Sequence, residues 1–246
     1  MRILLVNPNT TASMTEKAAL AARVVAASGT EIVAATARMG PVSIEGHYDG
    51  ALAVPGLLTE LMEHRAAGYD AAVIACFDDT GLDAARSLLD VPVLGLCESA
   101  VATAGFLAQR FTVVTTLERS RVLIENLVRH YGMGARAKVR ASDIPVLALE
   151  QAEPAAMAKI DAEIEKALLE DGAEAIVLGC AGMADLARGL QDRYGVPVVD
   201  GVAAAIKQAE ALVAQGLSTS KRGSYAAPLP KPFLGAMQGF APAGAK

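Results

Sequence analysis

Tryptophan is absent from this chain of 246 residues, and aromatic side chains make up only 4% of it. So few aromatic side chains leave little material for stacking nucleic-acid bases. Basic residues are not in excess either, because 22 Lys and Arg stand against 27 Asp and Glu, for a net charge of −5. No run of Lys or Arg is present to follow a phosphate backbone. These absences disfavour nucleic acid as a partner.

Long apolar runs are also missing. No stretch approaches the roughly 18 apolar residues that cross a bilayer, and Asn7 ends the apolar start of the chain too early for a signal peptide. We therefore expect a cytoplasmic protein without a membrane partner. The three cysteines, an odd number, do not form the disulfide framework of a small secreted protein. Each cysteine has to be explained individually.

What the chain does have is hydrophobicity, at 53% of residues, supplied mainly by Ala, Val and Leu. Short Val-, Ile- and Leu-rich runs alternate with longer Ala-rich segments of helical period, a pattern that predicts an α/β fold with parallel sheets. Strands are predicted at residues 2–6, 31–36, 71–75, 93–96, 111–115, 137–141, 145–149, 174–178 and 196–199.

An internal repeat is the most informative feature. The run 70–76 is echoed by 174–180, and Cys180 follows Cys76 by 104 residues. The first predicted strand and its loop are echoed from Arg110 onward, at an offset of 108. Strand–helix–strand units are common, so coincidence is the alternative explanation. The repeat favours two pseudo-symmetric, doubly wound α/β halves.

Both repeated strands end in a cysteine, and ligands of open parallel sheets bind beyond the carboxyl ends of the strands. A helix N-terminus after each cysteine is expected to lower the thiol pKa. Two halves facing one cleft would place Cys76 and Cys180 on opposite sides of a substrate. One base and one acid on opposite faces of a carbon is the arrangement that racemisation requires. Asn9, Thr115, Thr116 and the backbone amides after each cysteine lie at the right strand ends to stabilise the enolate oxygen.

Plainer interpretations apply to individual residues. A lone cysteine at the end of a buried strand is more often a small hydrophobic core residue, and Cys97, which has no counterpart in the other half, fits that role. Asp79 and Thr80 fit helix capping. The three histidines show no metal-ligand spacing with the cysteines. Only His47, in a glycine-flanked loop, is placed to reach a cleft, and a plain surface loop is an equal alternative.

The sequence resembles the hydantoin and allantoin racemases of the aspartate/glutamate racemase superfamily. The motifs that carry the resemblance are Val6–Thr11, Ser43–Asp49, Ala75–Asp83 and Asp171–Met183. The resemblance implies a cofactor-independent homo-oligomer without a metal, whose cleft lies between a half formed by residues 1–97 with the returning segment 208–246 and a half formed by residues 98–207. It implies Cys76 and Cys180 as the acid/base pair. It also implies a pocket lined by Asn9, Ile44, Phe77, Asp78, Thr115, Thr116, Ala181 and Gly182.

The residues after each cysteine bear on the substrate. Amino-acid racemases of the superfamily carry Asn-Thr and Thr-His there, whereas this chain has Phe77-Asp78 and Ala181-Gly182. That departure favours a neutral ring whose amide N–H groups Asp78 accepts, as in a 5-substituted hydantoin. Allantoin, with its polar 5-ureido group, is the alternative substrate.

Other functions remain open at this point. One is different chemistry in the same superfamily, such as maleate isomerisation or malonate decarboxylation, although a decarboxylase requires only one protonating thiol. Another is a non-catalytic small-molecule-binding protein built on the same halves. A redox pair fits poorly, because no Cys-x-x-Cys spacing is present.

Overall fold

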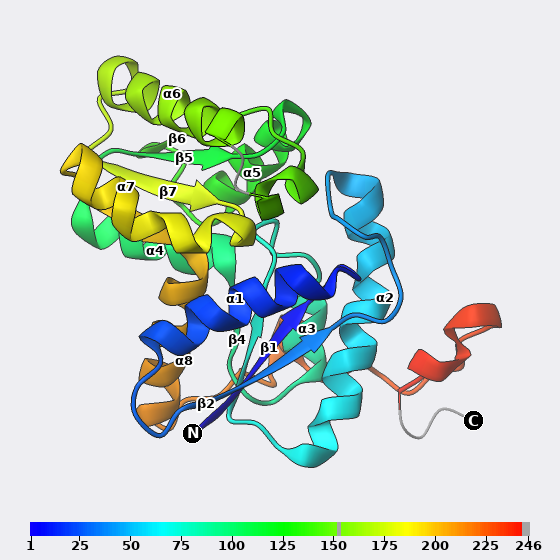
Figure 1. The fold of residues 1–246 in the computed structure, drawn as a ribbon. Coiled ribbons are helices and arrows are strands. Elements are labelled where there is room, and N and C mark those ends of the chain that lie inside the picture. Colours follow the sequence, from blue (N-terminus) through cyan, green and yellow to red (C-terminus); the bar gives the residue numbers. More distant parts are fainter. Residues whose placement is uncertain (152–153, 243–246) are drawn as a thin grey trace.

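Two parallel four-stranded sheets organise the protein, which the computed structural model describes over residues 1–151 and 154–242 (Figure 1). The strand order is β2-β1-β3-β4 in the first sheet and β6-β5-β7-β8 in the second, so the two sheets have the same topology. The strands are β1 (Arg2–Asn7), β2 (Glu31–Thr36), β3 (Ala71–Ile74), β4 (Val93–Gly95), β5 (Phe111–Thr115), β6 (Ala137–Ala141), β7 (Ala175–Gly179) and β8 (Val198–Asp200). The predicted α/β class with two doubly wound halves is confirmed.

The register of the strands confirms the internal repeat residue by residue. Ile3 of β1 pairs with Ala71 of β3, and Phe111 of β5 pairs with Ala175 of β7. Phe111 follows Ile3 by 108 residues and Ala175 follows Ala71 by 104, which are the two offsets seen in the sequence. The strand ends of the two halves, and the two cysteines that follow them, are therefore at equivalent positions in the register.

Helices cover both faces of each sheet. They are α1 (Ala12–Val25), α2 (His47–His64), α3 (Leu82–Leu88), α4 (Leu96–Leu107), α5 (Glu118–His130), α6 (Pro154–Glu170), α7 (Ala187–Tyr194) and α8 (Gly201–Ala214). Helices α1, α4, α5 and α8 contribute to the central core between the sheets, α2 and α3 cover the outer face of the first sheet, and α6 and α7 cover that of the second. Because each sheet is covered on both faces, its inner strands, such as β3 and β7, are buried along their whole length.

Alternate residues of each strand serve different cores, as the two-residue period of a strand requires. Ile3 and Leu5 point into the central core, whereas Leu4 and Val6 pack in the outer core with α2 and α3. The central core takes residues from both sheets, so the two halves share one apolar centre. This shared core holds the carboxyl ends of the two sheets in a fixed relation.

The strand predicted at 145–149 is wrong, because this segment lies in the 3-10 helix η2 (Val146–Gln151). Pro145 fixes its own φ and has no N–H to give to a sheet, and its carbonyl accepts from Ala148 N at 3.0 Å. Val146 and Leu149 are buried, one turn of a 3-10 helix apart, while Leu147 is 40% exposed. The apolar residues of this segment were interpreted as a strand, but their burial repeats every three residues, as in a 3-10 helix.

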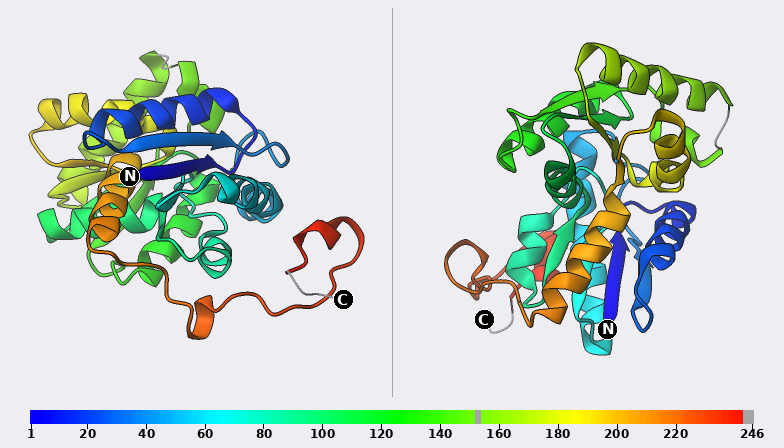
Figure 2. Two further views of the ribbon diagram at one scale, coloured as in Figure 1. Left: turned by 90° about the horizontal axis from the view of Figure 1, so that it is seen from below. Right: turned by 90° about the vertical axis from the view of Figure 1, so that its left-hand side faces the viewer.

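After α8 the chain returns to the first sheet. Thr219 Oγ1 donates to Val91 O at 2.7 Å, and Lys221 Nζ donates to Arg86 O at 2.7 Å. Beyond the short 3-10 turn η4 (Gly223–Tyr225), the chain leaves the body and carries the 3-10 helix η5 (Gly235–Phe240) at some distance from it (Figure 2). Residues 243–246 lie outside the described residues, and the predicted division at 97 and 207 stays a prediction. Among the described helices, none has the length and apolar character to cross a membrane.

Candidate active site

The first cysteine opens a tight turn at the end of β3. Ala75 N donates to Val6 O at 2.8 Å, which carries the ladder one residue past the strand. Asp79 N then donates to Cys76 O at 3.1 Å and closes the turn. Cys76 is half-buried, and its Sγ lies 3.5 Å from Thr80 Oγ1. The thiol therefore has a hydroxyl partner from its own loop.

The second cysteine opens the same kind of turn at the end of β7. Met183 N donates to Cys180 O at 3.1 Å, at the start of the 3-10 helix η3 (Ala181–Leu186). Cys180 is also half-buried, and Gly182 N donates to its Sγ at 3.4 Å. Thus the two thiols share a backbone frame in which the amide two residues later acts on the sulfur, and Cys76 has the Thr80 hydroxyl in addition.

Side chains of the first half bind the loops beside Cys180. Lys17 of α1 forms an ion pair with Asp185 at 3.1 Å, and its Nζ donates to Leu149 O at 3.5 Å. Glu45 Oε1 accepts from Val146 N at 3.1 Å. The charges of Lys17 and Glu45 both act on the Cys180 thiol. These contacts bring the loop of one half against the carboxyl edge of the other.

Burial raises the pKa of both thiols, so the lowered pKa expected from helix N-termini is wrong for this state. The pKa of Cys180 rises to about 11, although the Gly182 N–H opposes the shift. Burial, followed by the charge of Asp78, raises the pKa of Cys76 further, and the Thr80 hydroxyl opposes it. The charge of Cys180 acts on Cys76 as well, which places the two thiols within electrostatic range of each other.

Asp78 carries a buried carboxylate oxygen, Oδ2, that has no hydrogen-bond partner. Burial and then the neighbouring charge of Asp79 raise its pKa to about 7. Its charge acts on Cys76 and on Cys180. A buried acceptor without a partner is costly unless a ligand satisfies it, so Asp78 Oδ2 is left able to accept a hydrogen bond.

Asp79 has a structural partner set. Its carboxylate accepts from the N–H groups of Cys97 at 3.0 Å and Glu98 at 2.9 Å, and from Tyr131 OH at 2.7 Å. Asp79 therefore caps α4. The sequence had suggested that it caps the helix that directly follows it, α3. A Cβ at Gly95 would lie 2.4 Å from Asp79 Cγ, so only glycine fits before that helix. Burial raises the pKa of Asp79 to about 6 even with these donors.

Comparison with known proteins is consistent with this geometry. A family model described as Asp/Glu/Hydantoin racemase matches residues 3–209. The chain belongs to this family. Hydantoin racemase of Rhizobium meliloti is 51% identical over 236 residues, covering 96% of this chain and 98% of that protein. Hydantoin racemase of a Pseudomonas species is 46% identical over 241 residues, covering 98% and 97%. The structure of allantoin racemase from Klebsiella pneumoniae has a TM-score of 0.95 at 48% identity, covering 98% of this chain and 99% of that one.

The racemase has a cavity of about 460 Å³ beside Asp78 and Thr80, between the start of α2 and α5. Its lining is Gly46, His47, Gly50, Ala51, Val54, Asp78, Asp79, Thr80, Gly81, Leu123, Asn126, Leu127 and His130. Neither cysteine is part of this lining, and the link to Cys76 is Thr80, which touches both. His47 and His130 reach this cavity.

The other predicted pocket residues lie at the strand ends, and several use their polar atoms internally. Asn9 is buried, and its Oδ1 accepts from Asn7 Nδ2 at 2.9 Å and from Thr11 N at 3.0 Å. Thr115 Oγ1 donates to Gly179 O at 3.2 Å. Thr116 is buried one residue beyond β5. Their roles toward a substrate stay predictions.

The apolar members differ in their surroundings. Ile44 is 7% exposed, and the Phe77 side chain packs into the central core. Ala181 and Gly182 follow Cys180 directly, and Gly182 N is the amide that contacts the sulfur. Cys97 is fully buried in the central core, as its structural interpretation expected.

Three residues of this site were missed in the sequence. Lys17 and Tyr131 act over long sequence separations, and nothing local signals their partners. Thr80 had a signal that was overlooked, because a hydroxyl four residues after Cys76 can return to its sulfur once Asp79 closes the intervening turn.

Proposed function

We propose that this racemase inverts C5 of 5-substituted hydantoins by a two-base 1,1-proton transfer between Cys76 and Cys180, without a cofactor. One observation carries the proposal: the two thiols occupy equivalent positions after β3 and β7, and each opens the same backbone turn. The electrostatic influence of Cys180 on Cys76 and the influence of Asp78 on both thiols support a shared site.

The proposed step balances as follows. One cysteine, as thiolate, removes the C5 proton and becomes a thiol, and the C5–H electron pair moves into an enolate with the C4 carbonyl. The second cysteine, as thiol, gives its proton to the opposite face of C5 and becomes a thiolate. The product leaves with inverted C5, and the two cysteines have exchanged protonation states, ready for the mirror-image substrate.

Asp78 is proposed to bind the ring. Its unpartnered Oδ2 accepts a ring N–H, which satisfies the buried oxygen and orients the ring between the thiols. A free amino acid would instead bring its own carboxylate next to this carboxylate, at an electrostatic cost. The remaining proposed contacts are Asn9, Ile44, the main chain at Phe77, Thr115, Thr116, Ala181 and Gly182.

The 5-substituent is proposed to enter the cavity of about 460 Å³ beside Thr80. Val54, Leu123 and Leu127 suit an apolar group, as the relatives named hydantoin racemase would require. Asn126 and the two histidines would suit the polar ureido group of allantoin, and the solved allantoin racemases make this the second candidate.

The test follows one enantiomer of 5-isopropylhydantoin, and in parallel one of allantoin, in D₂O by optical rotation and by NMR at C5. Racemisation with deuterium incorporated at C5 is expected without added metal or pyridoxal phosphate. Cys76→Ser and Cys180→Ser should each lower inversion by at least roughly 10³-fold. Cys97→Ala is the matched control and should retain inversion. Full activity in either of the first two variants would refute the two-base mechanism.

A further inference from the structure

The C-terminal arm, residues 226–242, leaves the body of the protein, and among the described residues it forms no hydrogen bond or ion pair with that body. Its hydrogen bonds among the described residues are local, such as Met237 N to Leu234 O at 3.3 Å. Leu229 is 77% exposed and Leu234 is 81% exposed. Figure 2 shows the arm projecting from the body.

Such a conformation needs a surface to lie on. Fixing the backbone of one residue costs about 1–2 kcal/mol, and exposed leucines along an extended segment offset none of it. The arm is therefore shaped for a partner that covers its apolar side chains.

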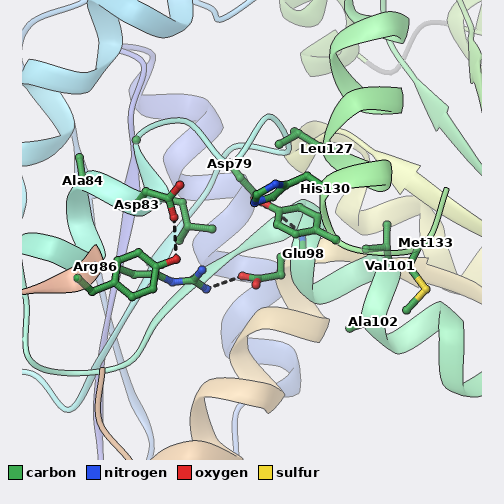
Figure 3. A pocket seen from close by; sticks show the side chains of 14 residues that line it. Asp79, Asp83, Ala84, Arg86, Glu98, Val101, Ala102, Leu127, His130 and Met133 are labelled. Carbon is green, nitrogen blue, oxygen red and sulfur yellow. Dashed lines mark hydrogen bonds and ion pairs between the residues drawn. The ribbon is translucent and has the colours of Figure 1, made fainter. Parts of the chain in front are cut away.

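A cavity lies where the arm begins. It has a volume of about 690 Å³ and is formed by α3, α4 and the end of α5 (Figure 3). Its lining, here called the α4 groove, is Asp79, Gly81, Leu82, Asp83, Ala84, Arg86, Glu98, Val101, Ala102, Leu127, His130, Tyr131, Met133 and Tyr225. Apolar and aromatic side chains form much of its wall.

The α4 groove has an acidic balance, because three carboxylates face one guanidinium. Arg86 is engaged by Glu98 and lies 5.8 Å over the ring of Tyr225, whose OH donates to Asp83 at 2.8 Å. These contacts fix the groove's shape and leave its net charge negative.

The arm has the complementary chemistry. Pro228, Pro230 and Pro232 alternate with Leu229 and Lys231, and Lys231 is the one charged side chain between residues 226 and 242. Proline-rich segments adopt an extended helix without internal hydrogen bonds and bind aromatic-lined grooves. A lysine within the segment suits a groove lined by carboxylates.

We propose that the C-terminal arm of one protomer docks into the α4 groove of a second copy of this chain, and that the exchange is reciprocal. The arm begins at Tyr225 on the rim of its own groove and runs outward, so two copies related by a twofold axis would cross their arms near that rim. A twofold contact of this kind uses the same two surfaces on both copies. Asp79 and Tyr131 form part of the groove wall, so the docked arm would shield from water the hydrogen bond that supports the Cys76 turn.

The experiment compares the full chain with three variants of it: a deletion that ends the chain at Ala227, the groove variant Ala102→Arg, and the reporter Phe233→Trp. The chain has no tryptophan, so all tryptophan emission comes from the reporter. Sedimentation should show that the deletion and Ala102→Arg each raise the apparent dissociation constant of the assembly by at least roughly 30-fold. Leu169→Arg, an 86% exposed position on α6, is the control and should sediment as the unmodified chain does.

Mixing distinguishes arm exchange from general damage. The deleted chain keeps its groove, and Ala102→Arg keeps its arm, so the two together should form a complex of one copy of each. The Phe233→Trp emission should shift to longer wavelength when Ala102→Arg is added to the same chain. Unchanged mass in both variants would overturn the proposal, as would an emission shift without a change in mass, which would mean that each arm folds back on its own groove.

Discussion

The phenol of Tyr131 donates a hydrogen bond of 2.7 Å to Oδ2 of Asp79, joining two residues 52 positions apart. Tyr131 follows α5 directly in the second half, whereas Asp79 closes the turn that presents Cys76 in the first. Asp79 has φ +48°, a conformation that costs energy for a residue with a side chain and persists because its carboxylate is held from three directions. The position of the first thiol thus depends on the second half.

Tyr131→Phe should show that dependence. Loss of the hydroxyl leaves part of a buried carboxylate unsatisfied, which should lower the free energy of unfolding by about 1–3 kcal/mol. We expect kcat for racemisation to fall roughly 10-fold with little change in KM, because a displaced turn affects proton transfer more than binding. Urea denaturation and polarimetry measure the two effects.

Tyr194→Phe is the matched control for this change. Tyr194 OH donates to Asp161 Oδ1 at 2.9 Å between α7 and α6, away from both cysteines. The same hydroxyl is removed there, so kcat should stay as in the unmodified enzyme. An equal fall in kcat for the two variants would mean that Tyr131 acts only through overall stability.

Asp78→Asn should change thiol reactivity and turnover in opposite directions. Removing the negative charge lowers the pKa of both thiols, since ionised Asp78 raises them. Alkylation of Cys76 and Cys180 by iodoacetamide at pH 8 should therefore become several-fold faster. Racemisation should become at least roughly 10-fold slower, because the carboxylate that accepts the ring N–H is gone.

Mass spectrometry of the alkylated peptides and polarimetry give the two rates. Asp90→Asn removes a charge from an exposed side chain and should leave both rates unchanged. Slower alkylation of Asp78→Asn would contradict the proposed influence of Asp78 on the thiols.

Much of the fold was predictable because the two halves repeat similar strand sequences at nearly constant offsets. The offsets of 108 and 104 residues also relate the strand pairings of the two sheets, so the equivalence of Cys76 and Cys180 could be predicted from the sequence alone. Residues 145–149 were wrongly predicted as a strand, because five mostly apolar residues are too few to show whether their period is that of a strand or of a 3-10 helix. Only the position of Pro145 hinted at the difference.

The electrostatics of the site was less predictable. The amide after Cys180 does contact its sulfur, as a helix start suggests, but burial outweighs that contact. Burial depends on how the two halves close, which a local motif does not contain. The partner of Asp79 illustrates the same limit, because α4 and Tyr131 meet it only in the folded chain.

Asp78 should also make stability depend on pH. Burial raises its folded pKa to about 7, above the ordinary value of 3.8. The folded state then holds a proton that the unfolded state has lost, so the stability from this group is full below pH 3.8 and declines as pH rises toward 7. Asp78→Asn removes the decline, and its advantage over the unmodified chain should grow between pH 4 and pH 8, by at most roughly 4 kcal/mol. Urea denaturation across this range measures the difference, and a constant difference would contradict the raised pKa.

Thr80→Val tests the one partner that distinguishes the two thiols. The Thr80 hydroxyl lies 3.5 Å from Cys76 Sγ and lowers the pKa of this thiol, so loss of the hydroxyl should reduce the thiolate fraction of Cys76 alone.

The equilibrium constant of a racemisation is one, so kcat/KM for both enantiomers must fall together and cannot reveal which thiol is affected. Single-thiol backgrounds can, because the remaining cysteine exchanges the C5 hydrogen of one enantiomer with D₂O without inverting it. With Cys180→Ser, Thr80→Val should slow exchange by roughly 10-fold, whereas with Cys76→Ser it should leave exchange unchanged. NMR at C5 follows both reactions, and equal slowing in the two backgrounds would mean that Thr80 shapes the pocket rather than the Cys76 thiol.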